Sequence, residues 1–121
     1  MMKASDIIKA DAVKRQVDPN KALQTIGGLV KTKSAVLMQE NNSVLLVRKI
    51  GDTSAEIHLF TKDSPKTLAK SVIGFVRKGR GLGIKTVYGM ADNQQIVELM
   101  KRVGINVQPS DIPQYNWKAN I

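Results

Sequence analysis

The chain has 121 residues, which is about the length of one domain. It contains no cysteine, which excludes disulfides, thiolate metal sites and cysteine nucleophiles, and its single histidine, His58, excludes a multi-histidine metal centre. We therefore expect no metal site. No stretch approaches the ~18 apolar residues of a membrane span, and charges interrupt the N-terminal segment where a secretory signal would be apolar, so we expect a cytoplasmic protein.

The charge of the chain is its strongest departure from average composition. Nineteen Lys and Arg against ten Asp and Glu give a net charge of +9. A field of this sign favours polyanions, so the expected partner is a nucleic acid or an acidic protein surface. A solvated surface that keeps the protein in solution explains the same charge, and composition leaves both interpretations open.

The N-terminal part, residues 1–33, is predicted to be helical. A first helix over residues 5–15 has Ile7, Ile8 and Val13 as its apolar positions.

A second helix is more clearly signalled. Asp18 and Pro19 have the residue types of an N-cap and first helical position, and Gly27 and Gly28 are expected to end the helix.

Residues 34–61 are predicted to form a three-strand antiparallel meander. The runs SAVLMQ, SVLLVRKI and AEIHLFTK are short and rich in Val, Leu and Ile, and the turn-forming stretches ENN and GDTS separate them. In the third run apolar residues alternate with Glu56, His58 and Phe60, so one face is apolar and the other mixed.

Residues 62–108 are predicted to follow as helix, strand, helix and strand. Ser64 and Pro65 begin an amphipathic helix that runs to about Lys78. IKTVYGM then reads as a strand, NQQIVELMKRVG as a helix with Asn93 as its cap and Gly104 at its end, and INVQ as a last strand. Residues 1–108 would thus form one domain, with residues 109–121 as an extended tail.

The glycines of VRKGRGLGIK, residues 76–85, resemble a phosphate-binding loop in composition only. Such a loop lies between a strand and the N-terminus of a helix, where free N–H groups and the positive dipole end meet the anion. Here the glycines follow a helix and precede a strand. We therefore interpret Gly79 as the left-handed residue that ends the helix.

An anion site is better placed at the start of the same helix, in FTKDSPKT. Lys62, Ser64 and Lys66 are the candidate binding residues there, because the first N–H groups of the helix point toward them. Asp63 and Pro65 argue against the site, since one is negative and the other lacks an N–H donor.

Two further sets of residues have alternative interpretations. Glu56 and His58 share one strand face, which suits a base assisted by a neighbour, but a polar surface gives the same pattern. Tyr115 and Trp117 in the tail are either an anchor for a partner or fold back onto the domain's own sheet.

The order of elements and the segment NQQIVELMKRVGI, residues 93–105, resemble the GCN5-related N-acetyltransferase (GNAT) family without a clear first strand. In that family an asparagine opens the helix after the fifth strand, and the run Leu-Tyr-x-x-x-Gly-Phe ends it. The resemblance implies an α/β (α+β) fold: a central, mostly antiparallel sheet with helices on both faces. It also implies acetyl-CoA as cofactor.

This sequence departs from that family at two functional places. The resemblance implies a pyrophosphate loop of the form Arg/Gln-x-x-Gly-x-Gly/Ala before the long helix, where this chain has TKDSPK. The tyrosine that often acts as general acid corresponds to Met100, whose thioether has no proton to give. Glu56 is the candidate for the general base.

The layout is also similar to the gene 13 type proteins of T7-like phages, a family associated with assembly of the internal virion structure. That resemblance implies a place in the host cytoplasm or the virion, with other virion proteins as possible partners.

The sequence therefore favours a non-catalytic GNAT-like protein with no cofactor, acting as a structural or binding component of a phage virion or its assembly. One alternative is a divergent acetyl-CoA-dependent N-acetyltransferase with Glu56 as base, and another is a basic nucleic-acid-binding module. The expected partner-binding residues, besides the aromatic pair of the tail, are basic: Lys62, Lys66, Lys70, Arg77, Lys78, Arg80 and Lys85.

Overall fold

A computed structural model describes residues 2–90 and 94–121 of the chain. They form four helices and one six-stranded sheet with the strand order β1-β2-β3-β4-β6-β5. The helices are α1 (Ala4–Lys14), α2 (Pro19–Lys31), α3 (Pro65–Gly81) and α4 (Gln94–Arg102). The strands are β1 (Val36–Glu40), β2 (Ser43–Lys49), β3 (Ser54–Thr61), β4 (Thr86–Gly89), β5 (Val107–Pro109) and β6 (Trp117–Asn120).

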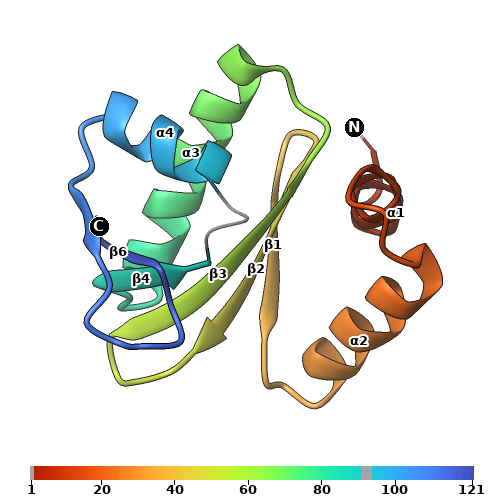
Figure 1. Cartoon of the computed structure of the whole chain (residues 1–121), viewed down its shortest axis with the longest axis horizontal. Helices are drawn as coiled ribbons and strands as arrows, with labels where there is room; N and C mark the ends of the chain where they lie inside the picture. Colours follow the sequence, from red (N-terminus) through yellow and green to blue (C-terminus); the bar gives the residue numbers. More distant parts are fainter. Residues whose placement is uncertain (1, 91–93) are drawn as a thin grey trace.

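Helices cover both faces of the sheet, as the fold class predicted from the sequence requires. Figure 1 shows α1 and α2 on one side of β1, β2 and β3, and α3 and α4 on the other. The alternation in β3 explains this layering: Ala55, Ile57 and Leu59 belong to the larger core under α3 and α4, whereas Phe60 packs with the smaller core under α1 and α2. Successive side chains of one strand thus serve two separate cores.

The three-strand meander is present, since β1 pairs antiparallel with β2 and β2 with β3. The connection from β3 through α3 to β4 makes the one parallel pair found within residues 2–90 and 94–121. Residues 2–33 hold α1 and α2 and no strand. In α1, Ile7 and Ile8 are buried as expected, but Val13 is exposed.

Asp18 caps α2 as predicted, because its carboxylate accepts the N–H of Asn20 at 2.9 Å. The expectation that Gly27 and Gly28 end this helix is wrong, since α2 continues to Lys31. Both glycines are exposed, and Ile26 before them is buried. Packing of Ile26 therefore stabilises the helix across two residues of low helix propensity.

Ser64 and Pro65 begin α3 as predicted, but Gly79 does not end it. The helix runs to Gly81, and Gly83, with φ +81°, is the left-handed residue. The N–H of Gly83 donates to the carbonyl of Arg80 and that of Ile84 to the carbonyl of Gly79, each at 3.0 Å, which are the two bonds of a Schellman ending.

Gly104, with φ +87°, ends α4 in the same way. The predicted cap Asn93 lies outside the described residues.

Residues 109–121 do not form a tail apart from the domain. Strand β6 lies between β4 and β5 and pairs with both, so these residues complete the sheet. Trp117 helps to hold β6 in the sheet, because its indole is buried in the larger core and its Nε1 donates to the carbonyl of Met90 at 3.1 Å. The residue opposite is Gly89, which leaves room for the ring.

Candidate functional site

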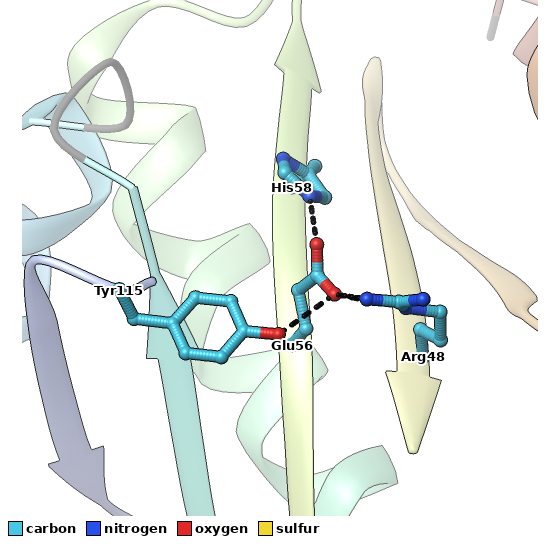
Figure 2. Close-up of polar contacts among 4 residues, drawn as sticks. All are labelled: Arg48, Glu56, His58 and Tyr115. Atoms are coloured by element: carbon cyan, nitrogen blue, oxygen red, sulfur yellow. Dashed lines mark hydrogen bonds and ion pairs between the residues drawn. The ribbon is translucent and has the colours of Figure 1, made fainter. Parts of the chain in front are cut away.

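Four polar side chains from three places in the chain meet on the face of the sheet that carries α1 and α2 (Figure 2). Arg48 on β2 and Glu56 on β3 are register partners, and Arg48 Nε donates to Glu56 Oε2 at 2.8 Å, with a second bond from Nη2. His58 Nε2 lies 2.7 Å from Glu56 Oε1, and Tyr115 Oη donates to Glu56 Oε2 at 3.0 Å. Glu56 is therefore the centre of the cluster.

The surroundings of Glu56 keep it ionised. Burial by itself raises the pKa of this carboxyl, but hydrogen bonds from His58, Arg48 and Tyr115, together with the charge of Arg48, outweigh burial and hold the pKa below its ordinary value. The hydrogen bond and charge of Glu56 in turn raise the pKa of Arg48. A carboxylate held in this way is a weak proton acceptor and a good anchor for its neighbours.

Two tyrosines form one wall of the cluster. Tyr88 on β4 is opposite Glu56 in the parallel register, and its ring centroid lies 5.5 Å from that of Tyr115. Burial, then a hydrogen bond to Asp111 at 3.0 Å, raises the pKa of Tyr88. Burial, then the bond to Glu56, raises the pKa of Tyr115. Both phenols therefore keep their protons at neutral pH.

The cluster lies where two strands part. Pairing of β3 with β4 is confined to Ser54–Glu56 against Thr86–Tyr88, while β3 itself continues to Thr61. Beyond Glu56, this edge of β3 is no longer paired with β4. Arg15, the C-cap residue of α1, reaches this edge and donates to the carbonyl of Leu59 at 3.1 Å.

At the start of α3, a surface hollow is lined by Asn41, Asn42, Lys62, Asp63, Ser64 and Thr67. The carboxylate of Asp63 is the centre of a hydrogen-bond network at this hollow. One carboxylate oxygen accepts from Ser43 Oγ at 2.6 Å, and Ser71 Oγ lies 3.2 Å from the same atom. The other oxygen accepts the Asn42 N–H at 3.1 Å. The two serines are fully buried, so Asp63 satisfies hydroxyls that have no access to water.

The three residues predicted to bind an anion here have other roles or point outward. Ser64 Oγ accepts the Thr67 N–H at 3.4 Å and so acts as the helix cap. Lys62 and Lys66 are exposed at the rim. Their binding of a cofactor stays a prediction.

The basic residues predicted to bind a partner are exposed on α3 and after it: Lys70, Arg77, Lys78, Arg80 and Lys85. Lys78 forms an ion pair with Glu40 at 3.1 Å. Binding of a nucleic acid or an acidic protein by this surface stays a prediction.

Tyr115 and Trp117 cannot be an exposed anchor for a partner, because both side chains are buried against the sheet. Of the two interpretations left open by the sequence, folding back onto the domain is the one observed.

Sequence reasoning missed Arg48, Tyr88 and the role of Tyr115. Arg48 could have been found, because the turn between the two strands fixes which residue lies opposite Glu56. The tyrosines could not, since the position of Tyr88 depends on the parallel pairing of β4 with β3 and that of Tyr115 on β6 entering the sheet. Met100, which corresponds to the family's tyrosine, is buried in the larger core at 2% exposure.

Among the described residues, no group of three acidic or histidine side chains could hold a metal ion. Within the same residues, none of the helices combines the length and the apolar character needed to cross a membrane.

No protein-family model matches the sequence, and no curated protein matches it. Solved structures do match the folded chain. Aminoglycoside 6'-acetyltransferase type Ii has a TM-score of 0.61 and 14% identity, over 97% of this chain and 85% of that chain. The Campylobacter jejuni N-acetyltransferase PseH in complex with acetyl coenzyme A has a TM-score of 0.57 and 15% identity, over 99% of this chain and 92% of that chain. A spermidine N-acetyltransferase chimera from Vibrio cholerae and hSSAT has a TM-score of 0.54 and 10% identity, over 98% of this chain and 90% of that chain.

These neighbours correct the main functional prediction. The chain was expected to be a non-catalytic structural or virion component, but the structures that it matches over nearly its whole length are N-acetyltransferases. They favour the alternative of an acetyl-CoA-dependent enzyme, and they give no support to the likeness with phage gene 13 type proteins. Acetyl coenzyme A is bound in one of these neighbours.

The match extends over 97% or more of this chain in all three neighbours, at TM-scores of 0.54 to 0.61. The chain therefore has the fold of the GCN5-related N-acetyltransferases.

Proposed function

We propose that the protein is an N-acetyltransferase that uses an acetyl thioester as donor and an amine as acceptor. The observation that carries the proposal is the Glu56–His58 pair, placed where β3 and β4 part, in a fold shared with N-acetyltransferases. The reaction joins the acetyl carbonyl to the amine nitrogen and releases a thiol. The amine loses a proton and the departing sulfur gains one.

His58 is the residue that accepts the proton in this proposal. Its Nε2 faces the ionised Glu56 carboxylate, so the proton of a neutral imidazole resides on Nε2 and the lone pair on Nδ1. Nδ1 has no hydrogen bond within the described residues, which leaves it available to an acceptor amine. Glu56 is then a positioning residue, because its own basicity is lowered by Arg48, His58 and Tyr115.

Tyr115 can supply a proton on the donor side. Its raised pKa keeps the phenol protonated, and its hydroxyl lies 3.0 Å from Glu56 at the same point of strand divergence. It therefore takes over the role that the family resemblance assigned to the position of Met100.

Acetyl-CoA would supply the thioester. The hollow at the start of α3 suits a diphosphate poorly, because the Asp63 carboxylate lines it as a like charge and already accepts the Asn42 N–H.

The direct test is amine-dependent thiol release from acetyl-CoA or another acetyl thioester. The chain contains no cysteine, so a thiol reagent reports only the released product. Polyamines, amino sugars and peptides with free amines would be compared as acceptors. We expect turnover with at least one of them, and His58→Asn, which retains folding by circular dichroism, to lower kcat by ~10²-fold or more. Absence of amine-dependent release across this panel would refute the proposal.

A further inference from the structure

A surface groove of about 330 Å³ lies between α3 and the segment that follows α4. Val76, Val103 and Ile105 are half-buried against the larger core and form its apolar floor, whereas Ile73 is 42% exposed. Two exposed arginines complete the lining, so the groove combines an apolar floor with a cationic rim. Six residues line it in all: Ile73, Val76, Arg77, Arg80, Val103 and Ile105.

The groove lies beside a stripe of exposed residues that runs along α3. The members of this stripe follow one another at alternating spacings of four and three residues, which places them on one face of the helix. At the α-helical rise of about 1.5 Å per residue, the stripe is about 21 Å long. Four of its members are basic, and the isoleucine lies at its middle: Lys66, Lys70, Ile73, Arg77 and Arg80.

The positive charge of this face is not neutralised within the described part of the chain. Helix α3 has no acidic residue there, and α4 has only Glu98. Among the same residues, none of the basic members of the stripe forms an ion pair. Lys101 and Arg102, exposed in the last turn of α4, add positive charge just before Val103. Charge complementarity therefore requires an acidic occupant.

The apolar floor separates an acidic protein segment from other polyanions. A nucleic-acid strand that binds by stacking needs aromatic side chains, and no aromatic residue is among those that line the groove. The phosphates of a duplex are best met by an unbroken row of Lys and Arg, whereas Ile73 interrupts the stripe at its centre. A membrane surface is flat and cannot enter a groove. A helix with acidic residues beside an apolar edge matches both the floor and the rim.

We propose that this groove binds an acidic amphipathic helix of a partner protein. Apolar side chains of the partner fill the floor, and its Glu or Asp residues pair with Arg77, Arg80 and the two lysines of the stripe. Each exposed pair contributes little in water, so the complex is weak and sensitive to salt. Helices α3 and α4 cover the face of the sheet opposite the Glu56 cluster (Figure 1), so the inference does not depend on the proposed acetyl transfer.

The probe is a fluorescein-labelled peptide of about 18 residues, long enough to span the stripe as a helix. Leu recurs in it at every third or fourth position and Glu flanks each Leu. By fluorescence anisotropy in ~50 mM salt, we expect a Kd of about 1–10 μM. Replacement of every Leu by Ala keeps the charge and the helix and should weaken binding about tenfold or more. Absence of binding, or equal affinity for the two peptides, would overturn the proposal.

Two changes in the protein locate the binding site. Ile73→Ala keeps every charge and should weaken binding about threefold or more, because it removes apolar contact. Arg77→Gln combined with Arg80→Gln should weaken it about fivefold or more. The matched control combines Lys9→Gln with Lys21→Gln, which removes the same two charges from exposed positions on α1 and α2, across the sheet. It should change Kd by less than about twofold, and equal weakening by the two double variants would overturn the proposal.

The other possible occupants are measured beside the peptide. They are a DNA duplex of about 16 base pairs and vesicles that contain phosphatidylserine, both at ~200 mM salt. We expect each to bind more weakly than the peptide. If either binds more tightly and loses that binding in the Arg77 and Arg80 double variant, the face belongs to that class of ligand and the proposed helix is refuted.

Discussion

Replacement of Glu56 by Gln changes one charge and almost nothing else, which makes it the sharpest test of the proposed roles. The glutamine carbonyl can accept from Arg48 and Tyr115 as the carboxylate does. Its amide nitrogen then faces His58 Nε2 and donates to it. An imidazole that accepts at Nε2 carries its proton on Nδ1, so the atom assigned to receive the proton of the amine has lost its lone pair.

The size of the two effects follows from this geometry. Every hydrogen bond to Glu56 has a counterpart in the variant, and the lost ion pair involves an Arg48 side chain that is 45% exposed, so unfolding free energy should fall by about 1 kcal/mol or less. Catalysis loses the correct tautomer, as when the orienting carboxylate of a Ser–His–Asp triad becomes an amide. We expect kcat to fall ~10²- to 10⁴-fold, or ~3–5 kcal/mol of transition-state free energy.

The assay is thiol release at saturating acetyl thioester, with kcat and KM determined separately, beside urea unfolding followed by the fluorescence of the single tryptophan. Glu98→Gln, the same substitution at an exposed position on α4, is the matched control and should leave kcat and KM unchanged. A Glu56→Gln variant with the kcat of the wild type would refute the assignment of the pair. So would a loss of activity that appears only in KM.

Three further outcomes follow from the structure. Gly28→Ala should raise the free energy of unfolding in urea by ~0.5–1 kcal/mol, since a Cβ there meets open space on a helix. Gly89→Ala should lower it by ~1–3 kcal/mol, since its Cβ would overlap the Trp117 ring. Equal changes of the unfolding free energy in the two variants would contradict this reasoning. Titration of tyrosinate absorbance should show both tyrosines ionising above pH 10, because burial raises the pKa of each; the stability that this gives is full below pH 10 and is lost as pH rises through the raised values. The stability difference between wild type and Glu56→Gln should be full above pH 4.5 and vanish as pH falls through the lowered pKa of Glu56; a difference that persists in acid would point to packing instead.

Local signals in the sequence were sufficient to predict those structural features whose physical cause lies within a few neighbouring residues. The Asp18 and Ser64 caps, the meander and the alternation of β3 were predictable, because each depends on residues within a few positions of one another. The glycines failed as stop signals at Gly27 and Gly79, where the helices continue by packing residues such as Ile26 against the sheet. A glycine marks a helix end only where the chain takes a positive φ.

The sequence alone determined the fold class and placed Glu56 and His58 on one strand face, since strand periodicity is a property of the chain itself. Only the tertiary structure decided what that face does. Arg48 and Tyr115 reach Glu56 because β2 pairs in one register and because residues 109–121 return as part of the sheet. These long-range pairings set the charge of Glu56 and with it the availability of His58, and they have no counterpart in any single segment of the sequence.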